Sequence, residues 1–395
     1  MKTVVFSLIL LTVVGTSVVR AGNGAHGIPS RPEGFLSFAK PINVSSPLLY
    51  PSSLAVGDLD HSGIPGLAVV SPDNGVPLFY ALGKGNGRFR LWRQDDNVGY
   101  APSFVSLADV DGDGNLDAIT TDILAGDLNV TFGDGKGNLH GGKRLLVGGV
   151  QSTYIVAVAD LNGDSIPDIV GTTNSGIFVI MGKGSREFAK AVTFGSGGQS
   201  PYGIAVGDLN HDGIPDLVVA NNGADQPPYN YNVAVLLGKG DGTFGRPMRY
   251  HGGVRPWQLV LGDFNGDGNL DLAVVPIDGK NRILVMLGKG DGTFSPPKSY
   301  RAGVAPHAIV AADFNGDGKL DLAVAAANVA VLLGNGDGTF QPPIDLRAPG
   351  HHPTELVVAD FTRDGKPDIG AVNGGDSTIS IFLNTTPFPT PSHTH

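Results

Sequence analysis

Short apolar runs separated by polar, glycine-rich segments make up most of the chain. One stretch shows the pattern clearly, with runs of β-type residues at 257–263, 270–275, 283–287 and 294–300. Runs of this length, rich in branched and aromatic residues and bounded by Asn, Asp, Gly or Pro, predict β-strands. The stretch therefore predicts a unit of four strands joined by tight turns.

The segments between these runs repeat along the chain. A ten-residue pattern, D-x-[DN]-x-D-G-x-x-D-[LI], recurs seven times at intervals of 47 to 55 residues, and its copies begin at Asp58, Asp109, Asp160, Asp208, Asp263, Asp313 and Asp360. A second pattern, whose clearest form is L-G-K-G-D-G-T-F, keeps step with the first. Four-stranded units repeated at this length are typical of β-propellers. We therefore predict an all-β fold, a seven-bladed β-propeller with four antiparallel strands per blade.

The two ends of the repeat array complement each other. The last repeat runs through residues 379–384 and stops before a fourth strand, whereas residues 35–44 form an unassigned β-type run before the first repeat. A closed ring leaves no exposed sheet edge between its first and last blades. We therefore expect the N-terminal strand to complete the last blade.

The sequence outside the repeats predicts export. Residues 1–21 combine Lys2, an apolar run at 4–14 and a small-residue cleavage site ending at Ala21, which is typical of a signal peptide. A membrane anchor is the alternative, but the apolar run is too short to span a bilayer comfortably. We assign residues 22–34 to an N-terminal linker, 35–384 to the propeller and 385–395 to a disordered Pro/Thr-rich tail. The expected location is secreted, either extracellular or periplasmic, with no membrane insertion.

The acidic loops carry the strongest chemical signal. In the loop that begins at Asp263, oxygen-bearing side chains occupy positions 1, 3, 5 and 9, and glycine occupies position 6. Calcium prefers six to eight oxygen ligands, and an Asp-rich turn with glycine at its sixth position can surround one. Strand-like flanks and Val274 at the twelfth position favour a β-hairpin calcium loop over a helix-loop-helix site. Ordinary Asp/Gly turns are the alternative.

Six loops have the ligand set, which predicts about six Ca²⁺ sites. The first loop lacks two carboxylates, because Ser62 and Gly66 stand at positions 5 and 9; in other loops Ser165 replaces the glycine and Thr362 replaces the asparagine. The predicted metal ligands are Asp109, Asp111, Asp113, Asp117, Asp160, Asn162, Asp164, Asp168, Asp208, Asn210, Asp212, Asp216, Asp263, Asn265, Asp267, Asp271, Asp313, Asn315, Asp317, Asp321, Asp360, Thr362, Asp364 and Asp368.

Composition removes several classes of function. The formal net charge of −10 opposes binding to a phosphate backbone, so nucleic acid is not expected as a partner. The absence of Cys excludes disulfides, Cys-ligated metals and thiol catalysis. More than half of the 37 acidic residues lie in the seven loops, which indicates that the negative charge serves metal binding more than the steering of cationic partners.

Together the two patterns resemble the FG-GAP/VCBS repeat, and the resemblance covers nearly all of residues 35–384. The family includes the propeller of integrin α subunits, fungal lectins and many bacterial secreted proteins. The resemblance implies a seven-bladed propeller with calcium in the loops between the first and second strands. It does not select one function, because relatives serve adhesion, sugar binding and, in some cases, lyase or dehydratase chemistry.

The residues that begin the innermost strands suggest a ligand site on the face opposite the acidic loops. Six residues before each first Asp the chain carries, in order, Ser52, Ser103, Tyr154, Tyr202, Trp257, His307 and Thr354. Tyr154, Tyr202, Trp257 and His307 would form an aromatic arc around the channel mouth, where flat rings with polar edges suit sugars or a protein surface. An insertion at 221–232 would bring Tyr229 and Tyr231 to the same face. The alternative is that these residues only cap the channel.

These observations predict a non-enzymatic ligand-binding or adhesion module, monomeric, whose partner is a glycan or an extracellular protein. No hydrolase, metalloprotease or nucleotide-binding motif is present, and no catalytic residue is assigned. The alternative from another class is a polysaccharide-directed lyase or related enzyme. It would use an acid-base cluster drawn from His251, His307, His351, His352, Arg255 and Glu355. A purely structural cell-surface role is a third possibility.

Overall fold

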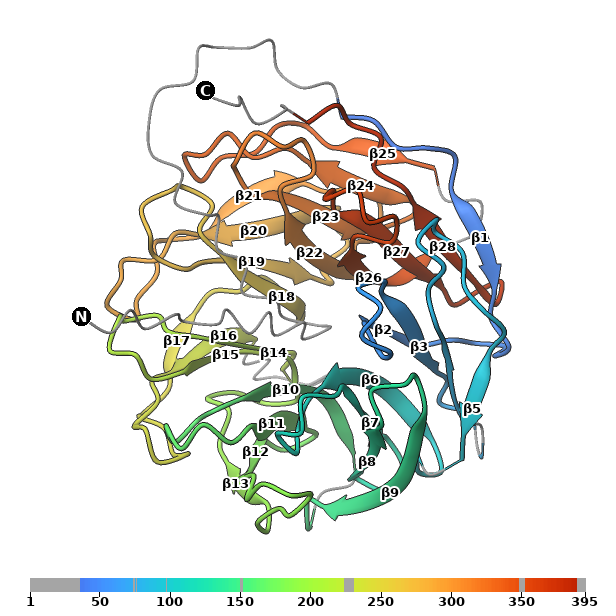
Figure 1. Cartoon of the computed structure of the whole chain (residues 1–395). Helices are drawn as coiled ribbons and strands as arrows, with labels where there is room; N and C mark the ends of the chain where they lie inside the picture. The colour runs from blue at the N-terminus through green and yellow to red at the C-terminus, as the bar shows by residue number, and fades with distance from the viewer. Residues whose placement is uncertain are drawn as a thin grey trace, which may run out of the picture.

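Seven separate sheets arranged in a ring make up the fold (Figure 1). The computed structural model describes residues 36–388 except 74, 76, 97, 150–151, 224–230 and 348–351. Each sheet has four antiparallel strands, and no helix occurs within the described ranges, so none there could cross a membrane. The prediction of an all-β, seven-bladed propeller is confirmed. The predicted signal peptide at 1–21 and linker at 22–34 lie outside the described residues.

The first four blades follow one another along the chain. Blade 1 consists of β2 (Ser53–Gly57), β3 (Gly66–Val70), β4 (Leu78–Ala81) and β5 (Arg93–Asp95). Blade 2 consists of β6 (Pro102–Ala108), β7 (Asp117–Asp122), β8 (Asp127–Gly133) and β9 (Leu139–Leu146). Blade 3 consists of β10 (Thr153–Ala159), β11 (Asp168–Thr173), β12 (Ile177–Ile180) and β13 (Val192–Phe194). Blade 4 consists of β14 (Pro201–Gly207), β15 (Asp216–Asn221), β16 (Asn232–Leu236) and β17 (Met248–Tyr250).

The last three blades close the ring. Blade 5 consists of β18 (Pro256–Gly262), β19 (Asp271–Pro276), β20 (Arg282–Met286) and β21 (Lys298–Arg301). Blade 6 consists of β22 (Ala308–Ala312), β23 (Asp321–Ala325), β24 (Val329–Leu332) and β25 (Ile344–Leu346). Blade 7 consists of β26 (Pro353–Ala359), β27 (Asp368–Asn373), β28 (Thr378–Phe382) and β1 (Ile42–Ser45). The first strand of each blade faces the ring axis, and neighbouring first strands contact one another.

Proline explains why two predicted strands are shorter than expected. The run at 294–300 contributes an isolated bridge at Phe294 and then β21, because Pro296 and Pro297 have no N–H to donate to a neighbouring strand. The run at 35–44 divides in the same way around Pro41, into a bridge at Phe38 and the strand β1. Both runs still form the outer edge of their blades.

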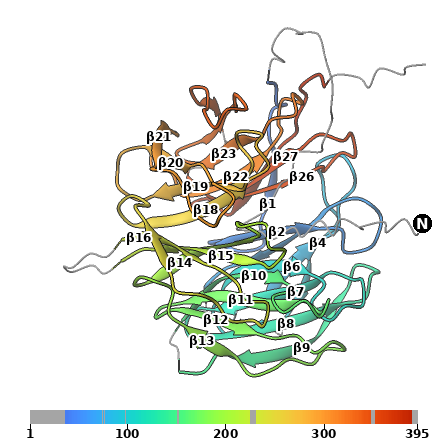
Figure 2. The ribbon, with the colours of Figure 1, turned by 90° about the vertical axis from the view of Figure 1, so that its left-hand side faces the viewer.

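The core lies between neighbouring blades. Side chains of the three inner strands are almost all buried, whereas the fourth strands β13, β17 and β25 are largely exposed. Seen from the side, the sheets lie face over face, with β14–β16 above β10–β12 (Figure 2). One hydrophobic cluster joins Val218 of blade 4 to Leu259 and Leu272 of blade 5. Because both faces of each inner strand are covered, the strands read as continuous apolar runs.

A hydrogen bond from a turn joins each of five acidic loops to the next blade. In these turns the sixth residue of the L-G-K-G-D-G-T-F pattern is a glycine, and its N–H donates to the carbonyl of the second loop residue in the preceding blade. Gly292, for example, donates to Leu209 O at 3.0 Å. Its φ is +80°, and an added Cβ would lie 2.6 Å from Leu237 Cδ2. Glycine is therefore required by both the backbone conformation and the close approach of the blades.

Blade 7 is closed by both ends of the chain. β1 pairs with β28 over Ile42 to Ser45, which confirms that the N-terminal strand completes the last blade. No turn links these two strands, and the Asn384 side-chain amide donates to Phe314 O at 2.8 Å in place of the turn glycine. Thr386 is fully buried, and Ser37 N–H donates to its hydroxyl at 3.0 Å. The first residues of the predicted tail at 385–395 thus belong to the closure; residues 389–395 lie outside the described part.

We expect Asn384→Ala to lower the free energy of unfolding by about 1–3 kcal/mol, because it leaves the buried Phe314 carbonyl without its donor. Urea denaturation at fixed calcium concentration measures the change. Asn335→Ala is the control, because Asn335 is exposed and bonds within its own turn, so about 0.5 kcal/mol or less is expected. Equal midpoints for the two variants would show that Asn384 does not secure the closure.

Candidate ligand cavity and acidic loops

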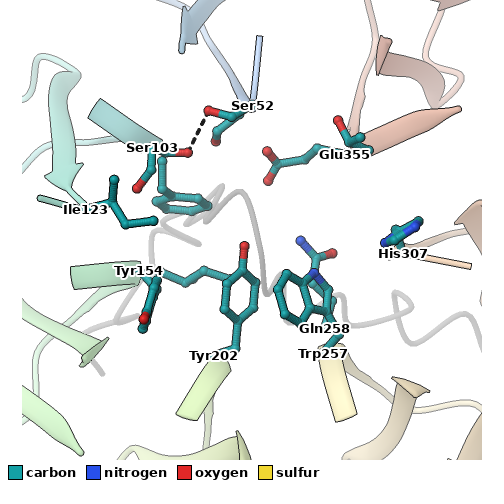
Figure 3. A pocket seen from close by; sticks show the side chains of 13 residues that line it. Ser52, Ser103, Ile123, Tyr154, Tyr202, Trp257, Gln258, His307 and Glu355 are labelled. Carbon is teal, nitrogen blue, oxygen red and sulfur yellow. Dashed lines mark hydrogen bonds between the residues drawn. The ribbon is translucent and has the colours of Figure 1, made fainter. Parts of the chain in front are cut away.

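A cavity of about 190 Å³ lies on the ring axis at the starts of the innermost strands (Figure 3). Its lining includes one residue at the same register position of every blade: Ser52, Ser103, Tyr154, Tyr202, Trp257, His307 and Thr354. The acidic loops follow the other ends of these strands. The structure therefore brings the predicted aromatic arc together on the face opposite the loops.

In five of the seven blades, a β-bulge turns the residue at this position toward the axis. In blade 5, Pro256 pairs with Pro276 and Gln258 with Val275, so Trp257 is an extra residue in its strand. The same irregularity occurs at the starts of β6, β10, β14 and β26. A bulge leaves one residue out of the ladder and redirects its side chain. Sequence reasoning missed the bulge, although the proline that precedes most of these residues is a signal for it.

The carbonyl groups of three of the bulged residues accept hydrogen bonds from hydroxyl groups of the preceding blade. Thr121 Oγ1 donates to Tyr154 O at 2.9 Å, and Thr172 Oγ1 donates to Tyr202 O at 2.8 Å. Ser52 Oγ donates to Ser103 O at 2.9 Å in the same way (Figure 3). These bonds satisfy carbonyls that the bulge removes from the ladder, and they fix the backbone around the cavity.

Three of the four arc residues form a continuous stack. The ring centroids of Tyr202 and Trp257 are 3.7 Å apart with an interplanar angle of 21°, and those of Tyr154 and Tyr202 are 5.4 Å apart at 37°. Burial raises the pKa of Tyr202, so its phenol stays neutral at physiological pH. The rings therefore cover one another's faces in part, and the stack offers its edges and hydroxyl groups to the cavity.

A buried acid lies across the cavity from the stack. Glu355 is 4 % exposed, and the Leu54 N–H donates to its Oε2 at 3.3 Å. Its Oε1 has no hydrogen-bond partner in the described part of the chain, and burial raises the pKa of Glu355 to about 8. Gln258 is also buried beside the cavity. The sequence placed Glu355 only in a possible acid-base cluster and did not predict it as a cavity residue.

The predicted acid-base cluster is only partly assembled. His307 and Glu355 line the cavity, whereas His251 and His352 are exposed. Burial, together with His352, lowers the pKa of His307, so this ring is neutral near pH 7. The Arg255 Nε–H donates to Asn222 Oδ1 at 3.1 Å. His351 lies outside the described residues.

The two tyrosines of the insertion are not cavity residues in the described structure. Tyr231 is half-buried next to β16 and does not line the cavity, and Tyr229 lies outside the described residues. The inserted connection joins the end of β15 to the start of β16, which is the cavity end of blade 4.

In each acidic loop the first aspartate organises the backbone. In the loop at Asp263, its carboxylate accepts the N–H groups of Gly266 at 2.7 Å, Asp267 at 3.2 Å and Gly268 at 2.9 Å. The side chains at positions 3 and 5 turn toward each other, and the Asn265 amide donates to Asp267 Oδ2 at 2.9 Å. The Asp267 N–H also donates to Asn265 Oδ1 at 2.9 Å, so the side chains at positions 1 and 3 share one backbone donor.

The ninth-position aspartates of these six loops have a second role that the sequence analysis missed. Asp271 is fully buried; the Phe264 N–H donates to its Oδ2 at 2.9 Å and the Gly288 N–H to its Oδ1 at 2.8 Å. The same two bonds occur at Asp117, Asp168, Asp216, Asp321 and Asp368. Burial, opposed by these bonds and aided by neighbouring carboxylates, raises the pKa of Asp271 to about 7. Each of these aspartates ties its loop to the end of the third strand.

The loop at Asp109 differs from the others because an arginine lies on it. Ligand atoms of Asp109, Asp111 and Asp117 lie within 4.8 Å of one another, which is compatible with a bound cation. Arg186 of blade 3 places its Nε 2.8 Å from Asp111 Oδ2 and its Nη2 3.6 Å from Asp113 Oδ2. It occupies the turn position where five other blades have glycine, with φ of 67°. The extra carboxylate at position 3 is therefore already paired with a cation of the protein.

The first loop departs from the pattern as the sequence predicts. Gly66 stands at its ninth position, and an added Cβ would lie 2.6 Å from Ala81 O, so the backbone leaves no room for a carboxylate. The loop at Asp208 shows the opposite case, because Asp208 Oδ1 is buried and has no hydrogen-bond partner among the described residues. An unpaired buried carboxylate oxygen of this kind is suited to a metal ligand.

Comparison with known proteins agrees with the repeat pattern. The family described as FG-GAP-like repeat matches residues 160–219, 215–274 and 263–324. No curated protein sequence matches the chain.

Several solved structures share the fold at low sequence identity. An Agrocybe aegerita lectin that recognises non-reducing terminal N-acetylglucosamine is 20 % identical, with a TM-score of 0.54 over 89 % of this chain and 86 % of the lectin. The BP39L lectin of Burkholderia pseudomallei is 16 % identical, with a TM-score of 0.65 over 87 % of this chain and 99 % of that one. BBS1N, solved in complex with ARL6DN, is 15 % identical, with a TM-score of 0.62 over 90 % and 98 %.

The matched segments run from blade 3 into blade 6. Each match spans an acidic loop together with the strands on either side of it, and the same loop occurs in blades outside the matched segment. Seven blades, seven loops and the turns that join them thus follow one plan. The chain contains FG-GAP-like repeats and folds as a seven-bladed β-propeller.

Proposed function

We propose that the protein is a secreted, calcium-stabilised binding module that holds one carbohydrate unit in the axial cavity without turning it over. A propeller with FG-GAP repeats and lectin-like structural neighbours fits a ligand-binding module. The observation that carries the proposal is the convergence of one residue from each of the seven blades on a single cavity.

The size and lining of the cavity favour a sugar over a protein surface. At about 190 Å³ it is smaller than the roughly 300 Å³ at which drug-sized ligand pockets begin, so it suits one small unit. Tyr202 and Trp257 offer ring edges, while Gln258, Thr354 and the serines of blades 1 and 2 offer neutral hydrogen-bonding groups. Aromatic rings beside neutral polar groups are suited to the apolar and hydroxyl-bearing parts of a sugar.

A polysaccharide lyase has weaker support. Of the six residues in the predicted acid-base cluster, only His307 and Glu355 line the cavity among those that the structure describes. Removal of a proton requires a base within hydrogen-bond reach of the substrate, and the exposed histidines do not meet this condition in the cavity. Binding requires no such base.

The acidic loops are proposed as the calcium sites. The donor set is made of carboxylate and amide oxygens with backbone carbonyls nearby, which is the chemistry that calcium prefers. Each ninth-position carboxylate accepts two N–H bonds and still has further lone pairs for a cation. A bound ion would supply positive charge to a turn in which several carboxylates face one another. Four loops present this donor set without an arginine between the carboxylates: those at Asp160, Asp208, Asp263 and Asp313. In the loop at Asp360, Thr362 supplies a hydroxyl oxygen at position 3 in place of the asparagine.

Export is consistent with this proposal. The N-terminal segment resembles a signal peptide, the chain has no Cys, and calcium sites of modest affinity are filled at the millimolar calcium levels found outside cells. At about 1 mM calcium, a site with a dissociation constant of about 0.1 mM adds about 1.4 kcal/mol to stability. Several such sites would replace disulfides as a source of stability.

Trp257 should report ligand binding by fluorescence. The chain has two tryptophans, so Trp92→Phe leaves Trp257 as the only one, and we expect a bound sugar to change its emission. Trp257→Ala should weaken binding at least about tenfold, because it removes a wall of the cavity. A glycan array identifies the sugar, and titration of the single-tryptophan variant measures its affinity. The site would lie elsewhere if a sugar bound on the array but did not change the emission of Trp257, and if Trp257→Ala bound that sugar with unchanged affinity.

Calcium removal should lower the melting temperature. Asp267→Ala removes a position-5 carboxylate and should reduce the calcium bound in equilibrium dialysis by one ion per chain, without unfolding the protein. Asp60→Ala is the matched control in the first loop, and it should leave the bound calcium unchanged. An unchanged melting temperature in excess chelator would contradict calcium stabilisation.

Arg186→Ala should open the loop at Asp109 to calcium. The substitution removes the cation that lies on Asp111 and Asp113, so we expect one additional bound ion per chain. Arg301→Ala, at an exposed position on β21, is the control and should add none. If the unmodified protein already binds an ion in this loop, the variant will show no gain and arginine is not a substitute for calcium there.

A further inference from the structure

We propose that the axial cavity selects a sugar unit with a free primary amine, such as an unacetylated 2-amino-2-deoxyhexose, and that Glu355 is the residue that selects it. The inference rests on the proposed carbohydrate-binding function and specifies the ligand class of the same site. It depends on one unpartnered acceptor, on the charges around it and on the rings that face it.

Glu355 is a buried hydrogen-bond acceptor with one unpaired oxygen. Its side chain is 96 % buried and points toward the ring axis, where Figure 3 shows its carboxylate opposite Tyr202 and Trp257. The Ser53 hydroxyl bonds to the carboxyl group and the Leu54 N–H donates to Oε2, which fixes the group, whereas Oε1 has no partner among the described residues. A buried acceptor without a donor is unfavourable, so a ligand that donates to Oε1 gains from the pairing.

The surroundings of Glu355 contain no positive charge that would pair with it. None of the described residues that line the cavity is Lys or Arg. The other titratable groups facing the cavity are Tyr154, Tyr202 and His307, and His352 lies near His307. The pKa of Tyr202 is raised and that of His307 is lowered, both by burial, so both side chains are neutral near pH 7. A cation that pairs with Glu355 must therefore come from the ligand.

The aromatic side of the cavity suits the same ligand. An ammonium group donates hydrogen bonds to a carboxylate and to a phenol oxygen such as that of Tyr202, and these bonds strengthen when water is excluded. The stack of Tyr202 on Trp257 lies across from Glu355. A sugar amine placed between them would meet the carboxylate, while the ring carbons of the sugar contact the stack. An N-acetyl group or a hydroxyl at the same carbon carries no charge and loses the ion pair.

Binding should be coupled to loss of a proton. Burial raises the pKa of Glu355 to about 8, so the empty cavity holds the carboxyl in its protonated form at pH 6. A ligand ammonium beside the group favours the ionised form and lowers this pKa. Amine binding at pH 6 should therefore release a proton into the buffer, whereas a neutral sugar should release none.

Three sugars that differ only at carbon 2 test the inference: oligosaccharides of glucosamine, of N-acetylglucosamine and of glucose, at equal length. Isothermal titration at pH 6, in two buffers of different ionisation enthalpy, measures affinity and proton release together. We expect the glucosamine oligosaccharide to bind at least about tenfold more tightly and to release a proton. Glu355→Gln should remove both differences while the melting temperature stays near that of the unsubstituted protein.

A control substitution and the measurement of proton release show whether Glu355 itself selects the amine. Glu187→Gln makes the same change at an exposed glutamate paired with Lys143, and it should keep the amine preference. If Glu355→Gln does not fold, proton release by the unsubstituted protein decides the question. Equal or tighter binding of the neutral sugars, with the Trp257 signal intact, would overturn the selection by Glu355 and leave the carbohydrate function standing. No binding of any sugar, together with a silent Trp257, would overturn both.

Discussion

The buried aspartate at the ninth position of each complete acidic loop is the contact on which the repeat depends. It is the first residue of the second strand, and its carboxylate accepts one N–H from the loop and one from the end of the third strand. The carbonyl of that same loop residue usually accepts the N–H of the next blade's turn. A single side chain thus links strand ends within a blade and presents the loop to its neighbour. The aspartate recurs in the sequence because the same pair of hydrogen bonds is made in each of these blades.

This arrangement explains which features could be predicted from the sequence. The blade number follows from local chemistry, because Asp, Gly and the apolar runs recur at fixed spacing and each is needed in every blade. The ring closure follows from the count of strands, because the last repeat lacks a fourth strand and the N-terminal run supplies one. The axial position of Tyr202 and Trp257 could also be predicted, since the register of each innermost strand is set by its acidic loop. Local spacing carries this information because the contacts concerned lie within one repeat.

Features that join residues far apart in the chain could not be predicted in this way. Asn384 replaces a turn glycine only because the two chain ends meet, and Arg186 meets Asp111 only because their blades are neighbours. The unpaired oxygen of Glu355 likewise depends on what the other blades place around the axis. In each case no pattern within the residue's own repeat indicates its role, because the contact that defines the role is made with another blade.

At both faces of the ring, backbone N–H and C=O groups at the strand ends need hydrogen-bond partners. The two faces satisfy these groups differently, and they therefore differ in how many residue types each position can accept. On the loop face, buried carboxylates and close-packed glycines satisfy these groups, so residue type is restricted by both charge and space. On the cavity face, hydroxyl groups such as that of Thr172 donate to carbonyls of bulged residues, so the backbone there is held without one fixed side-chain type at the bulge. Ser, Tyr, Trp, His and Thr can therefore occupy one position around the ring. A surface on which the side chain can vary while the backbone is held is the condition for recognition of a specific ligand.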